Sequence, residues 1–430
     1  MENQQERPSN TAADLRAFPP INYVKITLFG FALTALWSSL NTIVLPIRLL
    51  DFVPESLKNS YLGYMTFAGL VVAMLVQPII GASSDRASFR WGRRRPYILV
   101  GAVLALLLLP GIGLWSSYAL VFIFYCLLQA ATNTAQGPYQ GFIPDLVPVA
   151  RRGRAAGVKS LLELLGGISL ARLAAYFMDR YSPGDQTYWL WLTLGALGIV
   201  LLVTTTVTLI TVREKPGDLN PASRTPLLPD LVKIFRIDFK REPDFIWFLV
   251  SRGMMAVPGV ILQTFALYYL ADVVGVDSPA ASAANLLIAV GAGLVAAVYF
   301  AGHLSDRIGR KPVVIASGLL GAAGVLFLFY SRDTASILAS GAVIGLANGA
   351  LLSAAWAMAT DLAPKDAGAR YLGLANLSLA AGSALARLIG PVIDFFNNRS
   401  ENMGYTVMLL VCFVCFIAGS VLILKVKRIR

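Results

Sequence analysis

The sequence predicts an all-α membrane protein whose twelve transmembrane helices form two pseudo-symmetric six-helix halves. Three observations carry this prediction. The chain is unusually apolar, with 57% hydrophobic and 14% charged residues. Its apolar residues gather in stretches of about twenty residues, the length at which a helix crosses the hydrocarbon core of a bilayer. Motifs found in the first part of the chain recur in the second part in the same order.

The composition excludes most classes of soluble protein. A soluble domain carries roughly a quarter charged residues, whereas this chain has 14% and a mean hydropathy of +0.66. Only helices and closed barrels satisfy their backbone groups in hydrocarbon, and the alternating strands typical of a barrel are absent from the sequence. The net charge of +12 does not indicate nucleic-acid binding, because the basic residues lie in short segments between apolar stretches.

The apolar stretches define the expected spans, and the charges between them define the orientation. With the N-terminus placed inside, the inner segments hold 26 Lys and Arg residues and the outer loops hold 4. Cytoplasmic loops collect basic residues, so we expect both termini to be cytoplasmic and the protein to lie in the plasma (inner) membrane. The expected spans are 21–48, 60–82, 97–117, 119–148, 155–178, 188–212, 244–271, 282–302, 313–331, 335–362, 371–395 and 403–425.

The longest polar segment divides the chain into two halves. We expect a cytoplasmic tail at 1–20, a first half at 21–212, a central cytoplasmic loop at 213–243, a second half at 244–425 and a cytoplasmic tail at 426–430. Within the central loop, residues 227–236 have the pattern of an amphipathic helix at the inner membrane surface. A solvated linker is the alternative.

Two loops repeat each other at the inner ends of spans two and eight. Gly81-x3-Asp85-Arg86 precedes a basic segment at 92–96, and Gly302-x3-Asp306-Arg307 precedes another at 309–312. The glycine lets two helices approach closely. The aspartate at a helix C-terminus is unfavourable with the helix dipole and therefore needs a basic partner.

A second repeat follows spans four and ten. Asp145 is followed nine residues later by Arg154, and Asp361 is followed nine residues later by Arg370. We expect two gating networks that hold the cytoplasmic side closed and break when it opens. One contains Asp85, Arg86 and Asp145, and the other contains Asp306, Arg307 and Asp361. The alternative is that these residues only set the orientation. The repeat continues into the next span of each half, where a glycine precedes an arginine. Span five has Gly166 and Arg172, and span eleven has Gly382 and Arg387.

Polar residues inside four of the spans are candidates for solute binding. Side chains at i, i+3, i+4 and i+7 share one face of a helix, and polar groups within a membrane face a cavity or another helix. Amides, hydroxyls and indole faces suit a neutral polyol, although joining of helices is the alternative. The candidates are Trp37 and Asn41 in span one, Gln129, Asn133 and Gln136 in span four, Arg252 and Gln263 in span seven, and Trp356 in span ten.

Span five carries charges that are costly inside a membrane, at about 3 kcal/mol each. Lys159 and Glu163 are four residues apart and can pair. Glu163 is the single carboxylate placed well inside an expected span, which makes it the candidate for proton coupling. A static ion pair with Lys159 is the alternative. Arg172 lies on the opposite face of this helix and needs a partner elsewhere.

The loop motif resembles the signature of the major facilitator superfamily, which implies the major facilitator fold with spans one, four, seven and ten around the cavity. The first copy, with residues 74–79 leading into 84–96, resembles the sucrose/proton symporters and the glycoside-pentoside-hexuronide cation symporters. Two further features resemble these symporters. In span one, Trp37 is followed nine residues later by Pro46, and in span four Asn133 begins the motif at 133–138. The resemblance implies a secondary transporter that moves a sugar or glycoside by alternating access.

One departure from the family concerns coupling. The sucrose carriers have a proton-accepting Asp four residues before the equivalent of Asn133, where this chain has Gln129. Amides do not titrate, so we expect Gln129 to bind solute as a neutral group. A proton, another cation or no coupling ion all stay open. We expect Glu163→Gln to leave any proton-driven component in place.

Other functions are less consistent with the residues. An exporter of amphipathic drugs or metabolites would share the fold, and a membrane assembly or cofactor-delivery protein is an alternative from another class. HExxH, GxSxG and metal-ligand clusters are absent from the sequence, and its single histidine is His303, so we expect neither an enzyme nor a cofactor. The expected partners are a small-molecule solute and the lipid bilayer, and a proton or other cation is an open third partner. We expect a monomer that binds no nucleic acid.

Overall fold

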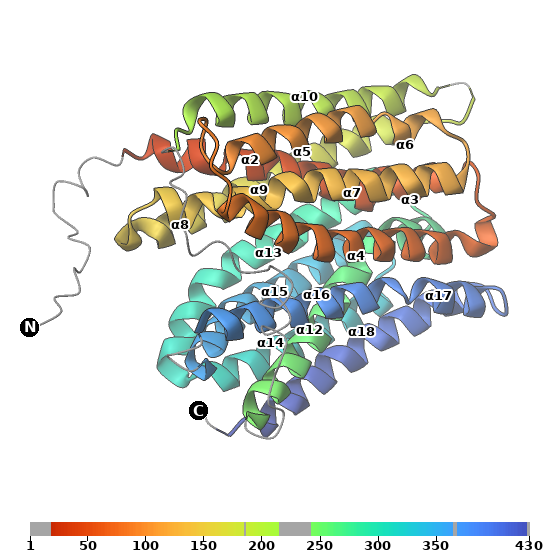
Figure 1. Ribbon diagram of the computed structural model, residues 1–430. Coiled ribbons are helices and arrows are strands. Elements are labelled where there is room, and N and C mark those ends of the chain that lie inside the picture. Colours follow the sequence, from red (N-terminus) through yellow and green to blue (C-terminus); the bar gives the residue numbers. More distant parts are fainter. Residues whose placement is uncertain (1–18, 185, 215–241, 364–367, 428–430) are drawn as a thin grey trace, which may run out of the picture.

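A computed structural model describes residues 19–184, 186–214, 242–363 and 368–427. These residues contain twelve helices long and apolar enough to cross a membrane. The twelve predicted spans are therefore confirmed. The spans of the first half pack together on one side of the molecule and those of the second half on the other (Figure 1). The expected amphipathic helix at 227–236 and most of the central loop lie outside the described residues.

The first half is built from six spans, and spans one, three and four each consist of more than one helical segment. Span one contains a π-helical segment, η1, between α2 and α3. The elements are α2 (Ile21–Ser39), η1 (Leu40–Val44), α3 (Leu45–Leu49), α4 (Lys58–Asp85), α5 (Arg95–Leu108) with α6 (Gly111–Leu114), α7 (Tyr118–Gln140) with α8 (Phe142–Leu146), α9 (Arg152–Met178) and α10 (Tyr188–Thr211).

The second half repeats this plan, including a π-helical segment, η5, near the end of its first span. There the amide of Gly275 donates to the carbonyl of Leu270, five residues earlier, at 3.1 Å. The elements are α12 (Pro243–Tyr269), η5 (Leu270–Val274), α13 (Pro279–Ile308), α14 (Arg310–Tyr330), α15 (Thr334–Leu362), α16 (Gly368–Arg387) with α17 (Gly390–Asn397), and α18 (Met403–Leu422).

Several helices extend beyond the apolar stretches that mark them in the sequence. Span two was expected at 60–82 and runs over Glu55–Asp85, and span eight was expected at 282–302 and runs over Pro279–Ile308. The physical reason is that helical hydrogen bonding continues through polar residues, whereas hydropathy marks only the part that would lie in hydrocarbon.

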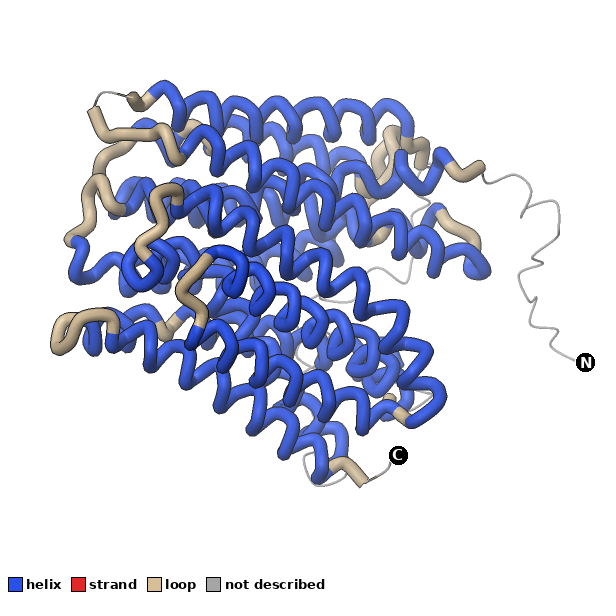
Figure 2. Tube along the Cα trace, turned by 180° about the vertical axis from the view of Figure 1, so that it is seen from behind, coloured by secondary structure: helices blue, strands red, loops and turns tan. Residues whose placement is uncertain are grey.

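The bundle has two ends. The basic end carries residues 86–94, 147–151 and 309, together with the start of α2 and the end of α18. The distal end carries residues 50–54, 115–117, 179–184, 186–187, 275–278, 331–333 and 398–402. The two halves lie close together at the distal end and diverge toward the basic end (Figures 1 and 2).

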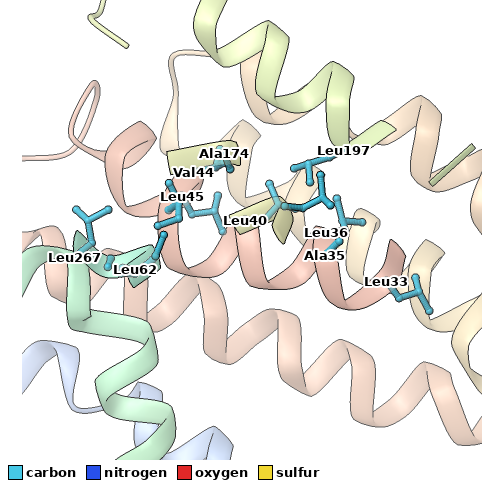
Figure 3. Packing of buried hydrophobic residues seen from close by; sticks show 14 of the residues in the cluster. Leu33, Ala35, Leu36, Leu40, Val44, Leu45, Leu62, Ala174, Leu197 and Leu267 are labelled. Carbon is cyan, nitrogen blue, oxygen red and sulfur yellow. The ribbon is translucent and has the colours of Figure 1, made fainter. Parts of the chain in front are cut away.

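The apolar core continues from one half into the other at the distal end. Leu36, Leu40 and Leu45 of span one pack in one buried cluster with Leu62 of α4 and Leu267 of α12 (Figure 3). Beside this cluster, the hydroxyl of Tyr268 donates to the carbonyl of Pro46 at 2.7 Å. The distal end is thus closed by a packed apolar core that both halves share, rather than by surface contacts.

Candidate solute-binding cavity

A cavity of about 550 Å³ lies between the two halves. This volume is within the range typical of small-molecule sites. Its wall is formed by α2, η1, α7 and α9 of the first half and by α12, α13, α14 and α15 of the second. Helices from both halves are therefore needed to complete the site.

Four of the eight residues predicted to bind solute line this cavity. They are Trp37, Asn41, Gln136 and Gln263. The other four, Gln129, Asn133, Arg252 and Trp356, are not part of its wall. For these four, the sequence prediction of a direct place in the cavity is not matched by the structure.

Gln129 and Asn133 lie behind the wall, inside the first half. The Gln129 side chain is only 8% exposed, and its amide donates to the Tyr125 hydroxyl at 3.2 Å. Tyr125 in turn donates to the side-chain oxygen of Asn41 at 3.0 Å, and its ring packs edge-on against Trp37. The Asn133 amide donates to the Gln129 carbonyl at 2.8 Å. Gln129 is thus connected to Asn41 of the cavity wall through the buried hydroxyl of Tyr125.

Arg252 and Trp356 lie elsewhere in the second half. Arg252 is 5% exposed, and among the described residues its Nε and one Nη have no hydrogen-bond partner. Trp356 is 46% exposed on the last turns of α15, toward the basic end and beyond the part of the helix that lines the cavity. Helical spacing shows which residues share a face, but not where that face points.

The cavity wall also contains residues that the sequence prediction missed. Tyr139, one turn beyond Gln136, donates its hydroxyl to the carbonyl of Thr27 at 2.9 Å. Asn348 of α15 contributes an amide to the cavity wall from the second half. In the sequence, Asn348 lies within a span and next to Gly349, the last of three glycines spaced four residues apart from Gly341. A polar side chain inside a membrane span is costly and therefore marks a candidate for a cavity or a helix contact.

Lys159 and Glu163 line the cavity as an ion pair. The ammonium nitrogen and a carboxylate oxygen are 2.9 Å apart, and each side chain is about a quarter exposed, at 25% and 26%. The ammonium also lies 5.9 Å from the centre of the Tyr139 ring. Arg172 does not join this pair and is exposed on another face of α9.

At the basic end of the first half, one guanidinium bridges two carboxylates. Arg94 contacts Asp85 at 2.8 Å and Asp145 at 2.6 Å, and it also donates to the carbonyl of Pro138. Arg93 contacts Asp145 at 2.6 Å, and this hydrogen bond raises the pKa of Arg93. The bridging position that the sequence prediction gave to Arg86 is occupied by Arg94.

The second half has a related network. Arg310 contacts Asp306 and lies 3.3 Å from Asp361, in the position expected for Arg307, which is exposed. Arg154 is exposed, and the Arg370 side chain lies outside the described part of the chain. The two signature glycines differ in their surroundings. A Cβ on Gly302 would lie 3.1 Å from the Ser353 hydroxyl, a tight contact, whereas one on Gly81 would lie 3.9 Å from Gly137, an ordinary van der Waals contact.

These networks differ from the predicted gate in one important respect. Each described ion pair at the basic end joins residues of the same half, and the pairs are intact although the halves diverge at that end. In this conformation they therefore fasten helices within a half and do not hold the two halves together.

Twelve spans in two repeated halves around a shared cavity define a membrane carrier. The family profile described as MFS/sugar transport protein matches residues 28–376. The chain belongs to this family, which consists of transporters and not of enzymes, and the resemblance seen in the sequence is confirmed.

Characterised relatives match parts of the chain. Rice sucrose transport protein SUT1 (Oryza sativa) is 32% identical over 112 residues, 21% of each chain. The human proton-associated sugar transporter A is 28% identical over 237 residues, 50% of this chain and 30% of the relative. The minor myo-inositol transporter IolF of Bacillus subtilis is 29% identical over 116 residues, 27% of this chain and 26% of the relative. The matches thus span less than a third of each relative.

Solved structures match nearly the whole chain. A bacterial homologue of the human lysosomal transporter Spinster, in an inward-facing and unoccupied conformation, aligns with a TM-score of 0.71 and 17% identity over 95% of this chain and 96% of that one. A D-xylose–proton symporter aligns with a TM-score of 0.70 and 17% identity over 95% and 98%. At this identity the likeness establishes the fold alone.

Proposed function

We propose that this protein is a secondary transporter that moves a neutral sugar or glycoside across a membrane by alternating access. The observation that carries this proposal is the cavity between the halves, whose wall combines amides with an indole ring. Family membership supports transport of a sugar-like solute. The similar proteins include sucrose and myo-inositol transporters, which supports a polyhydroxylated solute.

The chemistry of the wall favours a solute without charge. Asn41, Gln136, Gln263 and Asn348 can each donate and accept hydrogen bonds, which matches the hydroxyl groups of a sugar. The indole ring of Trp37 offers a flat apolar surface for the C–H faces of a pyranose ring. Lys159 and Glu163 neutralise each other at 2.9 Å, so this pair adds no net charge to the wall.

We also propose that the basic end faces the cytoplasm. The strong excess of Lys and Arg in the segments at this end supports that orientation. With the halves packed together at the distal end and diverging at the basic end, the conformation described here is then inward-facing.

Uptake of radiolabelled glycosides into proteoliposomes tests the proposed substrate class. Gln136→Ala is expected to raise KM about five- to tenfold, because one or two hydrogen bonds to the solute are lost at about 1 kcal/mol in total. Gln186→Ala, at an exposed distal loop, is the matched control and should leave KM unchanged. Transport of amphipathic cations without transport of any glycoside would overturn the proposal.

The same assay tests coupling. Glu163→Gln is expected to leave any proton-driven component of uptake in place, because the carboxylate is held in an ion pair with Lys159 and its protonation would leave that ammonium unpaired. Uptake is measured with and without an imposed pH gradient, and Glu401→Gln in an exposed distal loop is the control. Proton-driven accumulation that persists in Glu401→Gln but disappears in Glu163→Gln would make Glu163 the coupling site.

A further inference from the structure

The distal end of span five reaches across to the other half through a carboxylate. Asp179 follows α9 directly, and its two oxygens accept hydrogen bonds from the backbone amides of Ala280 and Ala281, both at 3.0 Å. These amides belong to the first turn of α13, which begins at Pro279. The first amides of a helix have no partner within the helix, so a residue of the first half completes the start of a helix in the second half.

The distal end of span eleven makes the reverse contact. Asp394 of α17 accepts from the backbone amides of Asn59 at 3.3 Å and Ser60 at 2.6 Å, and from the Asn59 side chain at 2.9 Å. Asn59 and Ser60 lie in the first turn of α4, which begins at Lys58. Asp394 is 3% exposed, so this contact is sealed from water.

The two contacts are related by the internal repeat. Span five of the first half meets span eight, and span eleven of the second half meets span two, which are the corresponding spans with the halves exchanged. The sequence carries the same relation: each aspartate stands seven residues after the arginine of its repeat, Arg172 in one case and Arg387 in the other. A repeated residue with a repeated contact indicates a shared role.

The physical basis of both contacts is the same. A carboxylate is stabilised by the positive end of the helix dipole, and its hydrogen bonds to backbone amides are strengthened by its charge. Each contact joins residues of opposite halves, so it requires the two halves to lie together at the distal end. Separation of the halves there breaks both contacts and leaves both helix starts without their partners.

The two contacts differ in strength. The Asp179 carboxyl accepts two hydrogen bonds, both from backbone amides. Asp394 has one more hydrogen bond and is next to a further link between the halves, in which Lys58 contacts Asp272 at 2.8 Å. We therefore expect the Asp394 contact to be the stronger one.

We propose that Asp179 and Asp394 are a two-fold related pair of latches that hold the distal gate closed and thereby set the ratio of inward-facing to outward-facing carrier. This rests on the proposed function, in which the distal end faces the outside. The latches act on the carrier without touching the solute, so they position the halves and do not contribute to solute binding.

Sided labelling of a single cysteine tests the latches. Cys126, Cys412 and Cys415 are first replaced by serine, and a cysteine is placed at Ala266, which lines the cavity and is 6% exposed. In the parent protein, a membrane-impermeant maleimide should label this cysteine from the basic side and not from the distal side. Labelling is performed in right-side-out and inside-out vesicles, which also checks the orientation of the chain.

Alanine at either latch is expected to increase labelling from the distal side about fivefold, as for the loss of a helix-capping side chain. Asp394→Ala should have the larger effect, and the double variant should exceed both. Asp179→Asn and Asp394→Asn keep an acceptor oxygen, so they should increase labelling from the distal side less than the alanine variants do. The control is Asp333→Ala, because Asp333 caps the start of its own helix α15 by accepting from the Ser336 amide at 3.0 Å. It should leave labelling unchanged.

The readout separates this proposal from the proposed function, because labelling needs no substrate. Unchanged labelling in both alanine variants would overturn the latches, and an effect at only one aspartate would overturn the two-fold pair. If the alanine variants of Asp179 and Asp394 changed distal-side labelling only as much as Asp333→Ala does, these two aspartates would be ordinary helix caps. A variant that fails to fold is recognised by loss of its thermal transition, and its asparagine counterpart then carries the test.

Discussion

Arg94→Ala is expected to lower the free energy of unfolding by about 2 kcal/mol, within the range for losing hydrogen bonds to charged groups, and to abolish transport. The Arg94 side chain is 7% exposed, and its guanidinium contacts Asp85 and Asp145 while it donates to the carbonyl of Pro138. Its removal leaves two carboxylates and a carbonyl without their shared donor. Thermal unfolding in detergent, followed by uptake, measures both effects.

Arg93→Ala provides the matched control. The two arginines are adjacent and both contact Asp145, but the Arg93 side chain is 35% exposed, and Asp145 is its described ion-pair partner. Exposed ion pairs contribute less than about 1 kcal/mol, so this variant should unfold near the parent temperature and keep most of its transport. Equal losses in the two variants would contradict the bridging role of Arg94.

Gly390→Val is expected to trap the carrier with its distal gate open and to reduce transport at least tenfold, because the change prevents a step required in every cycle. Gly390 begins α17, where the halves meet through their backbones. A Cβ at this position would lie 2.8 Å from the carbonyl carbon of Asn59 and 3.2 Å from the nitrogen of Ser60. Neither backbone atom can move aside without separation of the halves.

Gly373→Val, in α16 of the same span, is the control for Gly390→Val, since a Cβ there has nothing within 4 Å. It should transport normally. The decisive measurement is distal labelling of the cysteine at Ala266, which should rise in Gly390→Val and stay low in Gly373→Val. Full turnover in Gly390→Val would show that the halves do not close as tightly as described during the cycle.

Much of the fold could be predicted from the sequence because hydropathy and internal repetition are global signals. The twelve spans and the family follow from apolar stretches and from the loop motifs at Asp85 and Asp306. Which basic residue bridges the carboxylates did not follow. Five arginines lie between residues 86 and 95, and only the path of the loop between α4 and α5 decides that Arg94 reaches both Asp85 and Asp145.

The cavity was predictable in part for a similar reason. Helical spacing places Gln129 and Gln136 on one face of α7, but Gln129 is buried against Tyr125 within the first half, whereas Gln136 lines the cavity. The contacts of Asp179 and Asp394 join residues about 100 and 335 positions apart. No local pattern reveals such pairs, although the recurring Arg-x6-Asp spacing marks the two residues as equivalent.

The π-helical segments of spans one and seven have a consequence for comparing this chain with its homologues. A π-helical turn holds one residue more than an α-helical turn, so the residues beyond Leu40–Val44 and Leu270–Val274 are rotated by about 100° from the positions that continuous α-helical periodicity assigns to them. A homologue that lacks the extra residue would need a one-residue gap at this point of each span. Without that gap, an alignment would pair Pro46 and the residues after Val274 with side chains that point in another direction.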